Sequence, residues 1–133
     1  MRYYHLGVVY NGLRWPNRHA RIQEALRRCA TDWMRYSDND WIVYAASAEG
    51  IHIQVREAIR AGDGFLVLPV DITAPRQGLL PTWIWDWLDV DRSQPGWRDE
   101  VSAIIATLKP APPPKPELSL GEWLAALNPP KID

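Results

Sequence analysis

The chain has 133 residues, of which 47% are hydrophobic, and this composition predicts one folded domain with its own core. The apolar share excludes an intrinsically disordered chain. Eight tryptophans stand against a single phenylalanine, so wide, flat side chains must fill the core or lie at an interface.

The net charge of −1 hides an uneven distribution of charge along the chain. Residues 1–36 carry seven arginines and two acidic residues, a net charge of +5, whereas residues 37–133 carry eight basic and fourteen acidic residues, a net charge of −6. The basic excess lies mainly on one predicted helix. Two interpretations are open: the helix contacts nucleic-acid phosphates, or it is a solvated face that pairs with the acidic half.

Cys29 is the only cysteine, which excludes an intramolecular disulfide and suits a reducing compartment, so we expect a cytoplasmic protein. The segment after Met1 predicts a strand rather than a signal peptide. No apolar run approaches the roughly 20 residues that span a bilayer, so we expect no membrane partner.

The first predicted elements are a strand at residues 2–10 and a helix that begins near Asn17. The strand is rich in aromatic and β-branched residues, and its incomplete alternation predicts a central strand with both faces covered. We expect Asn17 to cap the helix. The apolar stripe expected along this helix comprises Ile22, Ala25, Leu26, Cys29 and Ala30. Within that stripe, Cys29 is expected to be a buried, inert thiol rather than a nucleophile.

Residues 32–37 and 41–47 predict an antiparallel hairpin around the turn Asp38-Asn39-Asp40. Ser47 is the expected cap of a second helix, which Gly62 should end. The buried stripe expected on this helix comprises Ile51, Val55, Ala58 and Ile59. An exposed basic ridge is expected at His52, Arg56 and Arg60.

The run at residues 65–72 is almost continuously apolar, which predicts a strand buried on both faces or nearly so. Pro69 has no N–H group and places the strand at an edge or a bulge. The order strand, helix, strand, strand, helix, strand predicts an α+β, ferredoxin-like fold, with a four-stranded antiparallel sheet and both helices on one face. The other face must be covered by the remaining chain, by a second subunit or by a ligand.

The C-terminal part predicts further helices and a proline-rich tail. Residues 81–88 fit a short helix better than a strand, and residues 97–108 fit an amphipathic helix. The tryptophans of the first of these helices are expected to cover the bare sheet face or a dimer seam. We therefore expect a ferredoxin-like domain at residues 1–89, an additional helix at 90–109, a proline-rich spacer at 110–117 and a short amphipathic helix at 118–133.

The tail helix would present an apolar face suited to docking a partner protein. The candidate partner-binding residues are Trp123, Leu124 and Leu127.

Several phrases together resemble small bacterial proteins of the SinR-like family. They are the strand that ends at Tyr10, a hairpin whose second strand begins Trp-Ile-Val, the phrase Gly-Asp-Gly-Phe-Leu-Val-Leu at residues 62–68, and Trp-Asp-Trp-Leu at residues 85–88. The resemblance covers residues 2–89. It implies the ferredoxin-like fold of the CRISPR-associated small nuclease or adaptation subunit and of virulence-associated protein D, and it implies a homodimer.

In those metal-dependent nucleases an aspartate stands at the end of the first strand, and two copies meet around a divalent cation across the dimer. Here the residue after Tyr10 is Asn11, which has the shape of aspartate without its charge. Tyr10 and Asn11 are therefore only weak catalytic candidates. No metal-binding residue is assigned, and a divalent metal is expected only if the protein is a nuclease.

Three other groups of residues could bind a metal ion, act as an acid–base pair or contact nucleic acid. Asp86, Asp89 and Asp91 could hold Mg²⁺ or Ca²⁺, but solvated caps at a helix end explain them better. His5 and Asp71, on neighbouring predicted strands, could form an acid–base pair, although strand histidines are usually structural. Guanidinium and stacking groups suited to nucleic acid gather near the first helix. These candidates are Arg14, Trp15, Arg18, Arg21 and Arg28.

Three functions follow, in order of preference. The first is a non-catalytic homodimeric binding or scaffold subunit that binds nucleic acid, with a defence or toxin–antitoxin setting implied by the resemblance alone. The second is a metal-dependent or acid–base endoribonuclease. The third is an adaptor that docks a protein partner through its C-terminal tail. No cofactor is expected for the first.

Overall fold

The computed structural model describes residues 1–12 and 17–108. The chain forms two compact units, Met1–Leu80 and a second that begins at Pro81. The first contains β1 (Arg2–Val9), α1 (Arg18–Cys29), β2 (Ala30–Arg35), β3 (Asp40–Ala45), α2 (Ala48–Ala58) and β4 (Gly64–Val70). The second contains α3 (Thr82–Asp89) and α4 (Trp97–Ala106). Among the described residues, no helix is long and apolar enough to cross a membrane.

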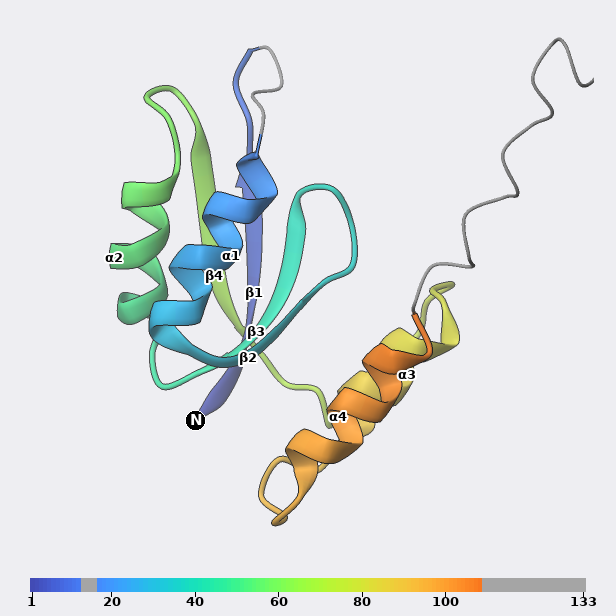
Figure 1. Ribbon diagram of the computed structural model, residues 1–133. Coiled ribbons are helices and arrows are strands. Elements are labelled where there is room, and N and C mark those ends of the chain that lie inside the picture. Colours follow the sequence, from blue (N-terminus) through green and yellow to red (C-terminus); the bar gives the residue numbers. More distant parts are fainter. Residues whose placement is uncertain (13–16, 109–133) are drawn as a thin grey trace, which may run out of the picture. The chain divides into compact units, whose positions relative to one another are not determined.

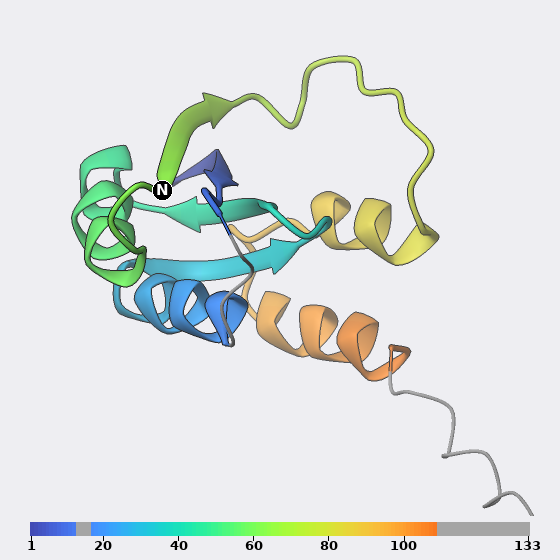
Figure 2. The same cartoon turned by 90° about the horizontal axis from the view of Figure 1, so that it is seen from above.

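The first unit has the predicted ferredoxin-like topology. Its four strands form one antiparallel sheet in the order β2-β3-β1-β4, so the first strand is central, as expected. Figure 1 shows α1 in front of the strands with α2 beside it, to the left of β4, and Figure 2 shows the two helices from above. Both crossover helices therefore lie against the same face of the sheet.

The core lies between these helices and the sheet, because alternate strand residues point toward the helices. Leu6 on β1 and Trp41 on β3 form a cross-strand pair and are fully buried. The helices contribute the buried stripes expected from their spacing: Ile22, Ala25 and Leu26 from α1, and Ile51, Val55 and Ala58 from α2.

Both predicted residues precede their helices, but only one of them caps its helix through its side chain. Ser47 caps α2, because its Oγ accepts a hydrogen bond from the Gly50 N–H at 3.0 Å. Asn17 precedes α1 with a left-handed φ of 60°, and its side chain makes no capping hydrogen bond. Its backbone carbonyl instead accepts the Arg21 N–H at 3.0 Å, so the expected side-chain cap was wrong.

The second helix also ends earlier than expected. Ile59 follows the last helical residue in an extended conformation, and Gly62 takes its positive φ of 92° in the turn beyond. Ala30, expected on the stripe of the first helix, begins β2.

The fourth strand corrects one prediction. Pro69 lies on an edge strand, as expected, but the strand is not buried on both faces. Leu66 is 56% exposed and Leu68 is 47% exposed, whereas Phe65 and Val67 pack against the core. A continuous apolar run therefore arises here because the side chains on the face opposite the helices are apolar as well as those on the core face.

The second unit is built around a buried arginine. Arg92 is 7% exposed and follows α3, where its Nη1 donates hydrogen bonds to the carbonyls of Trp87 at 3.1 Å and Val90 at 3.2 Å. Its guanidinium lies 4.0 Å from the ring centroid of Trp87 and 5.6 Å from that of Trp97. Hydrogen bonds and ring contacts together offset the cost of burying this charge.

Candidate nucleic-acid interface

The most basic element of the described structure is α1. It carries four arginines against one glutamate, a net charge of +3 with its histidine neutral. Its first turn contains no acidic residue, and Arg27 and Arg28 occupy its last turn, where they complement the negative end of the helix dipole. The sequence places these cations off the buried stripe, and the packing of α1 against the sheet leaves Arg21, Arg27 and Arg28 exposed.

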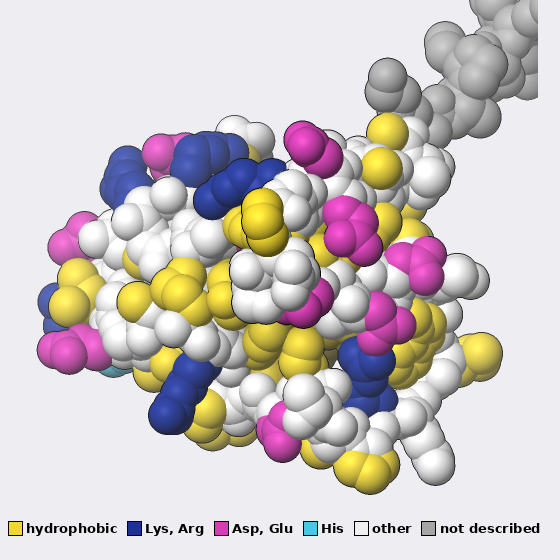
Figure 3. Space-filling model, turned by 90° about the horizontal axis from the view of Figure 1, so that it is seen from below, with side chains coloured by type: hydrophobic (Ala, Val, Ile, Leu, Met, Phe, Trp, Pro, Cys, Tyr) yellow, Lys and Arg dark blue, Asp and Glu magenta, His cyan; other side chains and the backbone are white. Residues whose placement is uncertain are grey.

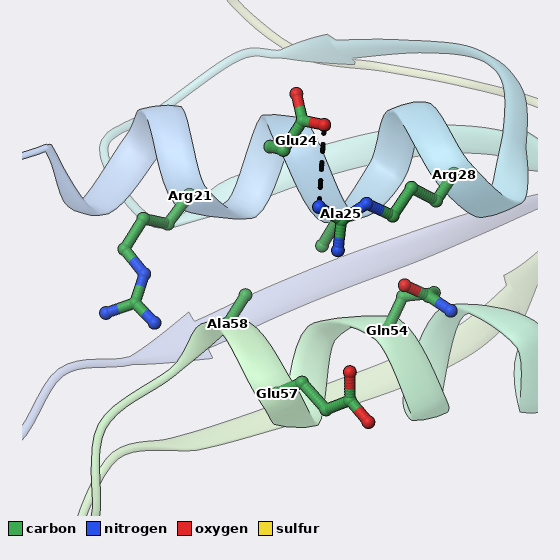
Figure 4. A pocket seen from close by; sticks show the side chains of 7 residues that line it. All are labelled: Arg21, Glu24, Ala25, Arg28, Gln54, Glu57 and Ala58. Carbon is green, nitrogen blue, oxygen red and sulfur yellow. Dashed lines mark ion pairs between the residues drawn. The ribbon is translucent and has the colours of Figure 1, made fainter.

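A groove runs between α1 and α2, with a cavity volume of about 240 Å³. Figure 4 shows that Arg21 and Arg28 reach it from α1, while Gln54 and Glu57 reach it from α2. Arg21 and Arg28 are seven residues apart, which is close to two helical turns, so they lie on the same side of α1. Two guanidinium groups thus line one side of this groove.

Glu24 lies among these arginines and neutralises part of their charge. It forms ion pairs with Arg27 and, at 3.7 Å, with Arg28. All three side chains are half-exposed or more, so each pair contributes only about 0.3–0.5 kcal/mol. An approaching phosphate could displace a carboxylate held so weakly. Figure 3 likewise shows dark blue basic side chains gathered together with a magenta acidic one among them.

Arg18 has a different environment from the other predicted nucleic-acid contacts. Its side chain is 13% exposed, lies 3.8 Å from the carboxylate of Asp38, and stacks over the ring of Tyr10 with 5.2 Å to the centroid. Burial raises the pKa of the Tyr10 hydroxyl, so Tyr10 stays protonated at neutral pH. Arg18 thus packs against Tyr10 and Asp38 and is withdrawn from the exposed surface of α1.

His19 lies beside Arg18 at the start of α1. Its Nε2 contacts the carbonyl oxygen of Asp38 at 2.7 Å, and its Nδ1 contacts Arg35. Burial lowers the pKa of His19, so its ring is neutral near pH 7 and adds no positive charge to the helix. The exposed cations of α1 are therefore Arg21, Arg27 and Arg28.

The strand end at Asn11 is held by a carboxylate from elsewhere in the chain. Asp63 accepts the Asn11 backbone N–H through Oδ1 at 2.8 Å and the Arg60 backbone N–H through Oδ2 at 3.1 Å. Both oxygens of this carboxylate are thus occupied by backbone donors, as in a structural cap. Within residues 1–12 and 17–108, no three histidine, cysteine or acidic side chains are grouped to hold a metal ion.

His5 has acid–base partners that differ from the expected one. Its Nε2 lies 2.7 Å from the Tyr36 hydroxyl and 3.3 Å from Oδ1 of Asp40, whose Oδ2 accepts the Ser37 hydroxyl at 2.5 Å. Asp71, the partner considered possible from the sequence, instead accepts hydrogen bonds from Thr73 in its own turn, which lower its pKa. The hydrogen-bonded His5 agrees with the structural histidine that the sequence favours.

The cluster of His5, Tyr36 and Asp40 lies on the sheet face opposite the helices, because His5 alternates with the buried Leu6. Burial and the nearby charge of Asp40 raise the pKa of the Tyr36 hydroxyl. Gly7 leaves space beside the cluster, since a Cβ there would lie 3.2 Å from Cε1 of His5. The register of the hairpin brings these residues together, and no local sequence pattern could have indicated it.

Two of the remaining candidate residues, Cys29 and Asp91, have structural roles in the described part of the chain. Cys29 is partly rather than fully buried, and this burial raises the pKa of its thiol, which contacts the Ala25 carbonyl at 3.4 Å. Asp91 accepts hydrogen bonds from Ser93, which lower its pKa and fix a turn after α3. Five predicted contacts lie outside the described residues: Arg14, Trp15, Trp123, Leu124 and Leu127.

Comparison of the chain with known protein families, with curated proteins and with solved structures finds no match. The function must therefore be argued from the residues and their geometry.

Proposed function

We propose that the protein is a non-catalytic binding subunit whose partner is a nucleic acid, contacted through the exposed arginines of α1. The observation that carries this proposal is the pair of guanidinium groups, Arg21 and Arg28, along one side of the α1–α2 groove. Arg27 extends the same exposed surface. These three residues are hereafter the arginine face.

The chemistry of the arginine face suits a polyanion. Arginine donates in a planar fork that matches phosphate oxygens, and it keeps its charge at every physiological pH. The only carboxylate of α1, Glu24, is exposed and weakly held, so it competes with a phosphate without blocking it. Phosphate contacts position a nucleic acid without reading its sequence, so we propose binding with little sequence preference.

We propose a non-catalytic role because of the residues at the end of β1. The metal-dependent nucleases whose fold the resemblance implies have an aspartate at the position of Asn11, and the nearby Asp63 is engaged by two backbone N–H groups. A hard divalent cation needs several oxygen ligands, which this end of the sheet does not offer among the described residues.

The proposal is tested by measuring the affinity for a labelled single-stranded RNA at several salt concentrations. Arg21→Ala combined with Arg28→Ala should make the slope of log K against log salt shallower by about 1.4, since two phosphate contacts on a single strand are removed. Arg98→Ala, which removes one exposed arginine from α4, is the charge control and should leave the slope near that of the wild type.

Glu24→Gln gives a test of opposite sign. It releases Arg27 and Arg28 from their ion pairs, so the affinity should rise. An unchanged slope in the double arginine variant, or weaker binding in Glu24→Gln, would show that the arginine face does not contact the nucleic acid.

A second candidate function, an acid–base endoribonuclease, is favoured by the cluster of His5, Tyr36 and Asp40. A histidine oriented by a carboxylate can act as a general base. Against this candidate, the two arginines of the strands, Arg2 and Arg35, pair with Ala45 and Trp41 and so lie on the other face of the sheet. Cleavage of RNA in the presence of a chelator, lost in His5→Gln, would establish this function, and no cleavage by the wild type would exclude it.

A further inference from the structure

The outer edge of β4 is unlike an ordinary exposed sheet edge. β4 spans seven residues, Gly64–Val70, and none of them is charged. It is an end strand of the sheet, so within the described residues no strand pairs with its outer side. Backbone N–H and C=O groups on such an edge are free to pair with another extended chain.

The opposite edge of the same sheet shows how this protein blocks pairing elsewhere. A shift in register between Ala30 and Asp32 interrupts β2, and the strand carries Asp32 and Arg35. Bulges and charged side chains are the usual means by which sheet edges avoid association. β4 has no charged side chain, and its one blocking device is Pro69, which removes a single backbone donor next to the last residue of the strand.

The centre of β4 is symmetric about its midpoint, Val67, because a leucine stands on each side of it. If two copies pair in antiparallel fashion about that residue, the whole strand is used. Leu66 then faces Leu68 of the second copy, and Phe65 faces Pro69 of the second copy. Both leucines are about half exposed, and their meeting would bury apolar surface on each side of the two-fold axis.

We propose that β4 is the interface between two copies of this chain, which pair edge to edge into a continuous eight-stranded antiparallel sheet. The two-fold axis is perpendicular to that sheet, because it relates antiparallel neighbours of the same sheet. The helix layers of both copies therefore lie on one common face. This interface is isologous, with each copy contributing the same strand.

If the proposed function holds, the dimer presents two arginine faces to the nucleic acid. α2 packs against β4, so the two α2 helices are central and the two α1 helices lie outside them on the same face. Two copies of the arginine face would then be presented to one nucleic acid, which raises the affinity through effective concentration.

The interface is tested in the full chain, without nucleic acid, by light scattering after size exclusion and by sedimentation. The wild type should be a dimer that dissociates on dilution. Leu66→Lys combined with Leu68→Lys places like charges opposite each other and should give a monomer with an unchanged circular dichroism spectrum. Ile53→Lys is the matched control, since Ile53 is an exposed apolar residue of α2, and it should stay dimeric.

A charge-swap experiment separates loss of pairing from damage to the strand. Leu66→Glu combined with Leu68→Glu should also be monomeric, and mixing the lysine and glutamate variants should restore a dimer with one copy of each. A monomeric wild type, a dimeric lysine variant, or a mixture that stays monomeric would each overturn the proposal. The oligomeric state is measured without nucleic acid, so its failure is distinct from failure of the proposed function.

Discussion

Asp63 offers a sharp test of whether the strand end is structural. Its carboxylate accepts the backbone N–H groups of Asn11 and Arg60 at 2.8 and 3.1 Å, which ties the end of β1 to the turn before β4. Hydrogen bonds to a charged group contribute about 1.5–3 kcal/mol each, and exposure of both donor residues places these near the lower end. Asp63→Ala should therefore lower the free energy of unfolding by about 3 kcal/mol, because both hydrogen bonds are lost.

Asp63→Asn keeps the shape and at least one acceptor oxygen, so about half of that loss is expected. Urea denaturation gives the free energy of unfolding, and hydrogen exchange reports the Asn11 and Arg60 amides directly. Both amides should exchange faster in Asp63→Ala. Unchanged stability together with unchanged exchange would refute the structural role, and the carboxylate would then be free for other chemistry.

Three further predictions follow from caps and titrating groups. Ser47→Ala should lower the free energy of unfolding by about 1 kcal/mol, because the Gly50 N–H loses its acceptor, and a stability within error of the wild type would contradict this. Burial raises the pKa of Cys29, so the native thiol should react slowly with a thiol reagent near pH 7 and faster as pH rises; equal rates in folded and urea-unfolded chains would contradict burial. Hydrogen bonds from Ser93 lower the pKa of Asp91, so the stability that this carboxylate contributes is present above its unfolded pKa of 3.8 and is lost as pH falls through the lower folded pKa. In Asp91→Asn the thermal stability should therefore fall less below pH 4 than in the wild type. Identical pH profiles would argue against a stabilising turn at Asp91.

The topology could be predicted because hydrophobic spacing is a local property. The stripe of α2 and its Ser47 cap lie within a few residues of each other, and both were read directly from the sequence. The preference for a helix at residues 81–88 was also correct, since α3 spans Thr82–Asp89. Apolar spacing of three and four residues outweighed the alternation of the tryptophans.

The errors concern properties that depend on distant parts of the chain. Burial of β4 on both faces was inferred from its apolar residues, yet Leu66 and Leu68 are exposed because they lie on the sheet face opposite the helices, where they pair with Gly7 and His5. Composition cannot distinguish a strand covered on both faces from one that offers an apolar edge to another chain.

The candidate sites show the same limit. The arginines of α1 were identified from charge and helical spacing, but only the packing of α1 shows that Arg18 is withdrawn while Arg21 and Arg28 line a groove with α2. The partners of His5 are set by the hairpin register, which joins Tyr36 to Asp40 through their backbones at 3.1 Å. Neither arrangement has a signature in a single stretch of sequence.

The measurement that tests the central claim most directly is the salt dependence of wild-type binding to a labelled single-stranded RNA. If Arg21, Arg27 and Arg28 each contact a phosphate, log K should fall with log salt with a slope of about −2 for each chain bound. No binding at low salt, or an affinity that stays constant as salt rises, would contradict nucleic-acid binding through the arginine face.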